Sequence, residues 1–140
     1  MRSAFSLDAI RAVLLAACVA LVAGPAVGQQ MLDAGRLAGR WQGYETVMGG
    51  ATIGSEVIFF PNGTYQRLSV LGDLMAMQWG NWEVAQNWLH FYPTDYEPKT
   101  YLGRAMAPPP SETWIVDYFD GMRIHATIAG SSEVNFQRVQ

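Results

Sequence analysis

The sequence predicts an all-β domain: an eight-stranded antiparallel up-and-down barrel with a short helical lead-in at its N-terminus. Two observations lead to this fold class. Beyond Gly39 the apolar residues recur at every second position, which is the period of half-buried strands. The alternating runs are short and are joined by brief turns rich in glycine, asparagine and aspartate. Closing eight such strands into a barrel buries their apolar faces without free edges, and a two-sheet sandwich is the alternative.

The elements follow from this pattern in chain order. A helical lead-in is expected over residues 31–38, before the period changes to two. Asn62-Gly63 lies between two apolar runs and predicts a tight hairpin, and Asp120-Gly121 predicts another. The eight expected strands are 41–47, 52–60, 65–71, 74–84 with a bend at Gly80, 88–92, 113–119, 122–129 and 133–139.

One long stretch, residues 93–111, is expected to be irregular, because the three prolines at 108–110 cannot donate the backbone hydrogen bonds of a strand. It carries Tyr96, Tyr101 and Leu102, which would form a contact surface if exposed. This supports an alternative function: an envelope protein-interaction module or inhibitor that acts through this loop.

The N-terminal residues have the pattern of an export signal. A positively charged start and an apolar run over 12–23 precede a group of small residues. This order is typical of a secretory signal peptide over 1–28, which leaves a barrel domain over 29–140 and predicts a periplasmic or secreted protein. Leu15-Ala16-Ala17-Cys18 also has the pattern of a lipobox, so a lipid anchor at Cys18 is the alternative.

Composition argues against several classes of function. The formal net charge is −3 and the one lysine is Lys99, so nucleic acid and anionic membranes are not expected partners. The one cysteine lies in the expected signal peptide, so the exported chain would have no disulfide and no thiol nucleophile. No phosphate loop, nucleophile elbow or zinc motif occurs, so no cofactor, no metal site and no catalytic residue are predicted, nor a transmembrane segment after the signal.

Gly39-Arg40-Trp41, together with Arg138 near the other end of the chain, resembles the opening motif and late arginine of the lipocalin and calycin superfamily. The stretches 60–65, 80–82 and 88–91 are similar to small exported bacterial lipocalin-like domains. The resemblance implies that Trp41 points inward at the closed end of the barrel and that Arg138 packs across its ring. A guanidinium can stack on an indole while its donors satisfy carbonyls there.

The aromatic content points to a binding function. The leading hypothesis is a non-catalytic binding protein for a small apolar or amphipathic ligand, although small barrels also fill their interior with side chains and bind nothing. Glu45 is in phase with Trp41, so it is expected to point inward and to pair with Arg67 or Arg138. The candidate ligand-binding residues are Tyr65, Arg67, Met75, Met77, Trp79, Trp114 and Tyr118.

Two further hypotheses about function remain open. His90 or His125 would serve as a general base if a carboxylate stood beside it in a cleft. The methionines at 75 and 77, with Trp79, also suit Cu(I), although such residues more often fill a core.

Overall fold

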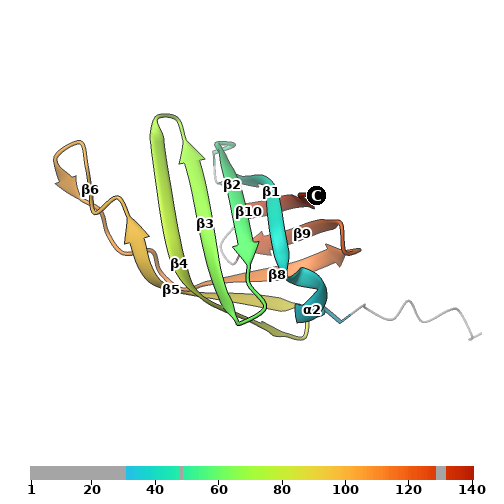
Figure 1. Ribbon diagram of the computed structural model, residues 1–140. Helices are drawn as coiled ribbons and strands as arrows, with labels where there is room; N and C mark the ends of the chain where they lie inside the picture. Colours follow the sequence, from blue (N-terminus) through green and yellow to red (C-terminus); the bar gives the residue numbers. More distant parts are fainter. Residues whose placement is uncertain (1–30, 48, 129–131) are drawn as a thin grey trace, which may run out of the picture.

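In a computed structural model the chain forms a closed antiparallel barrel, and the structure describes residues 31–47, 49–128 and 132–140 (Figure 1). The expected signal peptide and Cys18 lie outside the described residues. Neighbouring strands follow the order β1-β10-β9-β8-β5-β4-β3-β2 around the barrel, so the eight-stranded prediction is confirmed and the sandwich is wrong. The barrel strands are β1 (Gly39–Thr46), β2 (Thr52–Phe59), β3 (Thr64–Leu71), β4 (Leu74–Ala85), β5 (Trp88–Glu97), β8 (Glu112–Phe119), β9 (Arg123–Ile128) and β10 (Ser132–Arg138).

The helical lead-in is shorter than expected. It is a single turn, α2 (Ala34–Leu37), capped by the Asp33 carboxylate, which accepts a hydrogen bond from the backbone N–H of Gly35 at 2.8 Å. Its Leu37 side chain is fully buried, so packing rather than helix length holds it in place.

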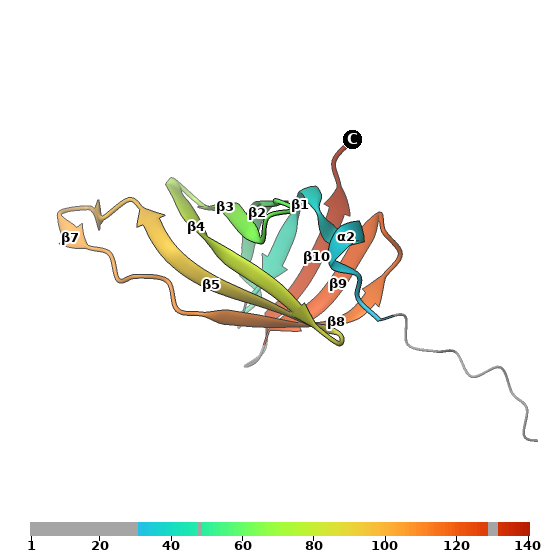
Figure 2. The same cartoon turned by 60° about the horizontal axis from the view of Figure 1, so that its bottom comes forward.

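The stretch 93–111 is not wholly irregular, which corrects the sequence prediction. Strand β5 continues through Pro93, and a small hairpin of β6 (Thr100–Tyr101) and β7 (Arg104–Ala105) follows. Strand β8 pairs with β5 only as far as Phe91, so beyond that point β5 has β4 as its one neighbour, and a strand edge tolerates proline. Figure 2 shows β4 and β5 running on past the barrel wall, with the small hairpin at their far end.

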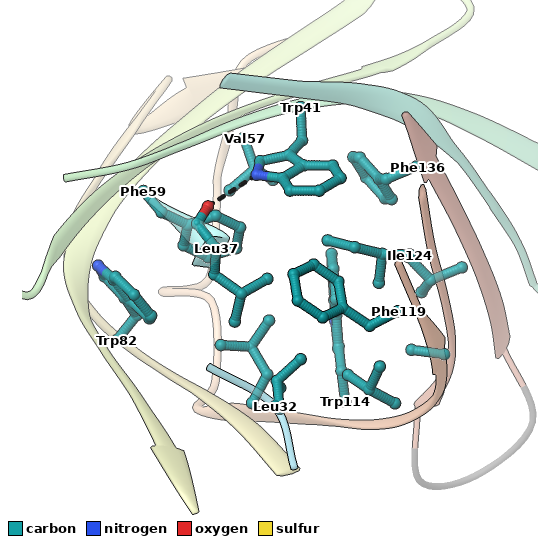
Figure 3. Close-up of a cluster of buried hydrophobic side chains, with 14 of the residues drawn as sticks. Leu32, Leu37, Trp41, Val57, Phe59, Trp82, Trp114, Phe119, Ile124 and Phe136 are labelled. Carbon is teal, nitrogen blue, oxygen red and sulfur yellow. Dashed lines mark hydrogen bonds between the residues drawn. The ribbon is translucent and has the colours of Figure 1, made fainter. Parts of the chain in front are cut away.

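Because the strands run up and down, each turn lies at one of two ends. The end that carries α2, the start of β1 and the β8–β9 turn is closed: the Arg36 side chain donates to the carbonyl of Asp120 at 3.0 Å. At this end the indole N–H of Trp41 donates to the Leu37 carbonyl at 2.8 Å (Figure 3). We call the opposite end, with the β1–β2 and β3–β4 turns and the 98–111 segment, the open end.

The core fills the closed half of the interior. Its aromatic rings contact one another in a chain: Phe59 lies 5.0 Å from Trp82, Phe91 lies 4.8 Å from Trp114, and Trp114 lies 5.3 Å from Phe136, measured between ring centroids. Tilted aromatic contacts of this kind give the closed half a fixed packing and leave polar groups to the open half.

Candidate functional site

A polar cluster lies inside the barrel on the side of the open end. Strand β3 contributes Arg67, the centre of this cluster, and Tyr65 beside it. The alternation of side chains along the strand turns both inward, and both are almost completely buried. Glu45, near the end of β1, and Glu112, at the start of β8, reach Arg67 from other walls of the barrel. Ser55 on β2 completes what we call the Arg67 cluster: Arg67, Glu45, Glu112 and Ser55.

Arg67 bridges two carboxylates. One terminal nitrogen, Nη1, lies 2.9 Å from Glu112 Oε1, and the other, Nη2, forms an ion pair with Glu45 Oε1. The guanidinium Nε donates to Ser55 Oγ at 3.4 Å. The expectation that Glu45 points inward and pairs with Arg67 or Arg138 is confirmed, with Arg67 as the partner. The side chains of Arg67 and Glu45 are 5% and 7% exposed, whereas that of Glu112 is 26% exposed, so the cluster meets solvent at Glu112.

Aromatic rings surround the guanidinium. Its carbon lies 5.4 Å from the ring centroid of Trp114 and 5.8 Å from that of Phe91, within the range of cation–π attraction. The Trp114 indole N–H donates to Glu112 Oε1, so this carboxylate holds both Arg67 and the ring beside it. The cluster therefore has apolar walls and a charged centre, a lining found in small-molecule sites.

Tyr65 links the cluster to the next strand. Its hydroxyl donates to Gln78 Oε1 at 2.7 Å, and burial, with the nearby charge of Glu112, raises its pKa well above the ordinary tyrosine range. The hydroxyl thus stays protonated and remains a donor at any physiological pH.

A small pocket adjoins the cluster. Arg67, Gln78 and Tyr96 are cross-strand partners in one row across β3, β4 and β5. A pocket of about 110 Å³ lies over this row, with Gln78 and Tyr96 on one side and Met106 and Pro109 on the other. The Tyr96 hydroxyl donates to the Met106 carbonyl at 3.0 Å, which holds the segment over the strands. The pocket has room for a group of a few non-hydrogen atoms about one strand spacing from Arg67.

The structure brings together three of the seven candidate ligand-binding residues, Tyr65, Arg67 and Trp114. On β4, Met75, Met77 and Trp79 alternate with Gln78, so they do not face the Arg67 cluster, although Met77 lines the adjoining pocket. The inner face of β4 at this level carries small or polar side chains instead, because it must fit beside Tyr65 and Arg67. The apolar residues on the outer face alternate in the same way as core residues, which is why the sequence suggested that they point inward.

Tyr118 also points outward. It is in phase with Trp114 and Val116 in the sequence, but a β-bulge between Val116 and Tyr118 reverses the alternation, and Phe119 faces inward instead. Whether any of these residues contacts a ligand stays a prediction.

Sequence reasoning missed Glu112, although a signal was present. Glu112 is two residues before Trp114, so the two share a face of one strand. Gln78 and Ser55 were missed because only the pairing of β3 with β2 and β4 brings them to Tyr65 and Arg67.

The two histidines lie on the outer surface. His90 alternates with the buried Leu89 and Phe91, and its Nδ1 is 2.8 Å from Thr113 Oγ1. His125 is hydrogen-bonded through Nδ1 to Asp117 Oδ1. Within the described part of the chain, no three histidine, cysteine or carboxylate side chains are grouped closely enough to hold a metal, and no helix is long and apolar enough to cross a membrane.

Comparison with known proteins supports the fold. No family model and no curated protein matches the sequence. Among solved structures, the chain is similar to a lipocalin-like protein from Bacteroides uniformis, with 18% sequence identity and a TM-score of 0.52 over 74% of this chain and 99% of that one. The closed eight-stranded antiparallel barrel, sealed at one end by Trp41 and Arg138, is therefore a lipocalin-like barrel.

Proposed function

We propose that this chain is an exported, non-catalytic binding protein for a small amphipathic ligand whose polar end reaches the Arg67 cluster from the open end. The observation that carries the proposal is a buried arginine held between two carboxylates in a barrel interior. Burying the charges of Arg67 and Glu45 is costly, and in a purely structural barrel apolar side chains of similar volume would often be as stable or more stable. A lipocalin-like fold supports ligand binding in general.

The charge of the cluster selects the class of ligand. One guanidinium faces two carboxylates, so the cluster carries an excess of one negative charge. Glu45 Oε1 has no hydrogen bond beyond its ion pair with Arg67, and Glu112 is partly open to solvent. The best-matched polar end is therefore a small cation or hydrogen-bond donor such as an amine. The first few carbons of the ligand's apolar chain would lie against Tyr96, Met106 and Pro109 in the adjoining pocket, and a longer chain would continue toward solvent at the open end.

Isothermal titration calorimetry with octylamine, octanol and octanoate tests this proposal. We expect octylamine to bind most tightly, and Glu112→Gln to weaken it by roughly tenfold, which corresponds to about 1.4 kcal/mol. Glu56→Gln is the matched control, since Glu56 pairs with Arg40 on the outer surface. Native mass spectrometry of protein recovered from the periplasm would identify a retained natural ligand. Recovery of ligand-free protein, with no heat from any of the three probes, would contradict the proposal.

A second candidate, an interaction module acting through residues 93–111, is favoured by the projecting hairpin. Leu102 at its tip is 84% exposed and adopts a left-handed backbone conformation with φ of 50°. A leucine held so far from the barrel suits contact with another protein. Leu102→Ser should abolish co-purification of such a partner from envelope extracts and leave octylamine binding unchanged. Identical sets of co-purifying proteins for both chains would argue against this role.

A further inference from the structure

The outer surface of β1, β10, β9 and β8 carries a groove of about 540 Å³ that is separate from the barrel interior. Strand register sets its long axis. Tyr44, Asn135, His125 and Tyr118 are successive cross-strand partners and form one row across all four strands. At a spacing of about 4.8 Å between strands, the row spans roughly 14 Å from one tyrosine to the other.

A second row lies beside the first, on the side of the closed end. It consists of Gln42, Gln137 and Arg123, which are also cross-strand partners and also line the groove. The outward side chains of the two rows are phenol rings, amides, one imidazole and one guanidinium, and none is aliphatic.

Two local features of the backbone create the groove. The β-bulge at Asp117 turns Tyr118 outward and aligns it with His125. On β1, a Cβ at Gly43 would collide with the carbonyl of Asn135, so only glycine allows β1 and β10 to approach this closely. Gly43 itself lines the groove between Gln42 and Tyr44.

Neighbouring carboxylates orient the polar groups. Asp117 binds His125 Nδ1, which leaves Nε2 as the ring nitrogen available to a ligand. Asp120 accepts a hydrogen bond from the Tyr118 hydroxyl at 3.0 Å, which fixes that end of the ring. Arg123 forms no ion pair among the residues that the structure describes, so its five N–H donors are available.

The tyrosines at the two ends provide exposed ring surface. Tyr44 is 48% exposed and Tyr118 is 52% exposed. An exposed phenol ring offers a flat face with negative potential, which attracts the C–H groups of a sugar ring. Asparagine, glutamine, arginine and histidine between the two rings match hydroxyl groups, which both donate and accept hydrogen bonds.

We infer that this groove, lined by Tyr44, Asn135, His125, Tyr118 and Arg123, binds a short oligosaccharide chain along the tyrosine row. Its length suits an extended chain of a few sugar rings with a terminal ring on each tyrosine. A lipid would need exposed aliphatic walls, whereas Ile124 and Phe136, the large apolar residues at the groove, are each only 2% exposed. A compact anion would need several convergent cations, whereas Arg123 is the one guanidinium among the lining residues of this groove, and the carboxylates of Asp120 and Asp117 hold its Tyr118 and His125.

The probes for the test are maltohexaose, cellohexaose, chitohexaose and hexagalacturonate, each titrated by calorimetry. We expect at least one to bind the intact chain. Tyr44→Ala and Tyr118→Ala should each weaken that probe by roughly three- to tenfold, the value of one aromatic contact. Tyr118→Phe keeps the ring and should bind within about twofold of the parent chain.

Tyr92→Ala is the matched control. Tyr92 is likewise an exposed tyrosine on an outer strand surface, and its hydroxyl donates to Glu83 at 2.7 Å as that of Tyr118 does to Asp120. Tyr92→Ala should leave oligosaccharide binding unchanged. Thermal unfolding of all variants establishes that they are folded. The inference is overturned if none of the four probes binds, or if binding is indifferent to both groove tyrosines. It is equally overturned if Tyr92→Ala weakens binding as much as Tyr118→Ala. Octylamine binding in the interior should be the same in every groove variant, which separates this site from the proposed one.

Discussion

The guanidinium carbon of Arg138 lies 4.4 Å from the ring centroid of Trp41, its direct cross-strand partner. Arg138 comes from the last strand and Trp41 from the first, so this contact joins the two ends of the domain. The donors of Arg138 are used as well: Nε donates to Gly121 at 2.8 Å, Nη1 to Ala38 at 2.9 Å, and Nη2 to the carbonyl of Arg36. The pair closes the barrel and ties α2 and the β8–β9 turn to it.

Trp41→Ala is expected to destabilise the domain by about 3–5 kcal/mol, because it deletes a fully buried aromatic side chain and leaves a cavity. Urea unfolding at equilibrium measures the loss. Trp88→Ala, at a half-exposed position on β5, is the control and should have little effect. A loss below about 0.5 kcal/mol for Trp41→Ala would show that Trp41 does not seal the barrel.

Gly39→Ala is expected to cost about 1–3 kcal/mol. Gly39 has φ of 131°, which disfavours any L side chain, and a Cβ there would lie 2.5 Å from Nη1 of Arg138. Because both residues belong to one contact, Gly39→Ala and Arg138→Ala should be non-additive, with the double variant losing less than the sum. Strict additivity in urea unfolding would contradict a direct clash.

Arg67→Met is expected to cost about 3–5 kcal/mol, because it leaves the buried carboxylate of Glu45 without its partner. Adding Glu45→Gln should restore part of the stability by removing the isolated charge. Arg40→Met, which breaks the exposed pair with Glu56, is the control and should change stability little. Failure of Glu45→Gln to rescue Arg67→Met would show that the two residues do not form a coupled buried pair.

Asp120 should make stability depend on pH. The backbone N–H groups of Met122 and Arg123 donate to its carboxylate at 2.8 and 2.7 Å and lower its pKa below the ordinary 3.8. Because the pKa of Asp120 is lower in the folded state, its carboxylate adds to the free energy of unfolding above pH 3.8. This contribution is lost as the pH falls through the folded-state pKa. In Asp120→Asn this part of the acid dependence should disappear, as urea unfolding between neutral and strongly acid pH would measure. Parallel acid profiles for the two chains would contradict it.

From the expected signal peptide over residues 1–28, we predict that the exported chain begins at Gln29. Mass spectrometry of the protein secreted by a bacterial host should give this N-terminus, because the small residues before it suit a signal peptidase. Cys18→Ser should leave the mature mass unchanged. A lipid-modified N-terminus at Cys18 would instead establish the membrane-anchored form.

The sequence predicted the barrel well because strand period and turn residues are local signals. It also predicted that Glu45 points inward, since Glu45 is in phase with Trp41, and left Arg67 and Arg138 as its possible partners, of which the structure selects Arg67. Met75, Met77 and Trp79 do not face the Arg67 cluster as expected, although Met77 lines the adjoining pocket, because an apolar outer face and an apolar inner face give the same alternation. Tyr118 was misplaced because the extra residue of a bulge reverses alternation without leaving a mark in composition.

By itself, the sequence determined the number of barrel strands and most of their limits, because these depend on short-range periodicity and turn chemistry, whereas the closing pair was implied by the resemblance to lipocalins. Only the tertiary structure decided which strand face turns inward past a bulge, how far β5 extends beyond the barrel, and which side chains meet across strands. The Arg67 cluster and the outer groove both depend on register between strands distant in sequence. Register is set by the fit of all neighbouring strands at once, so no single segment encodes it.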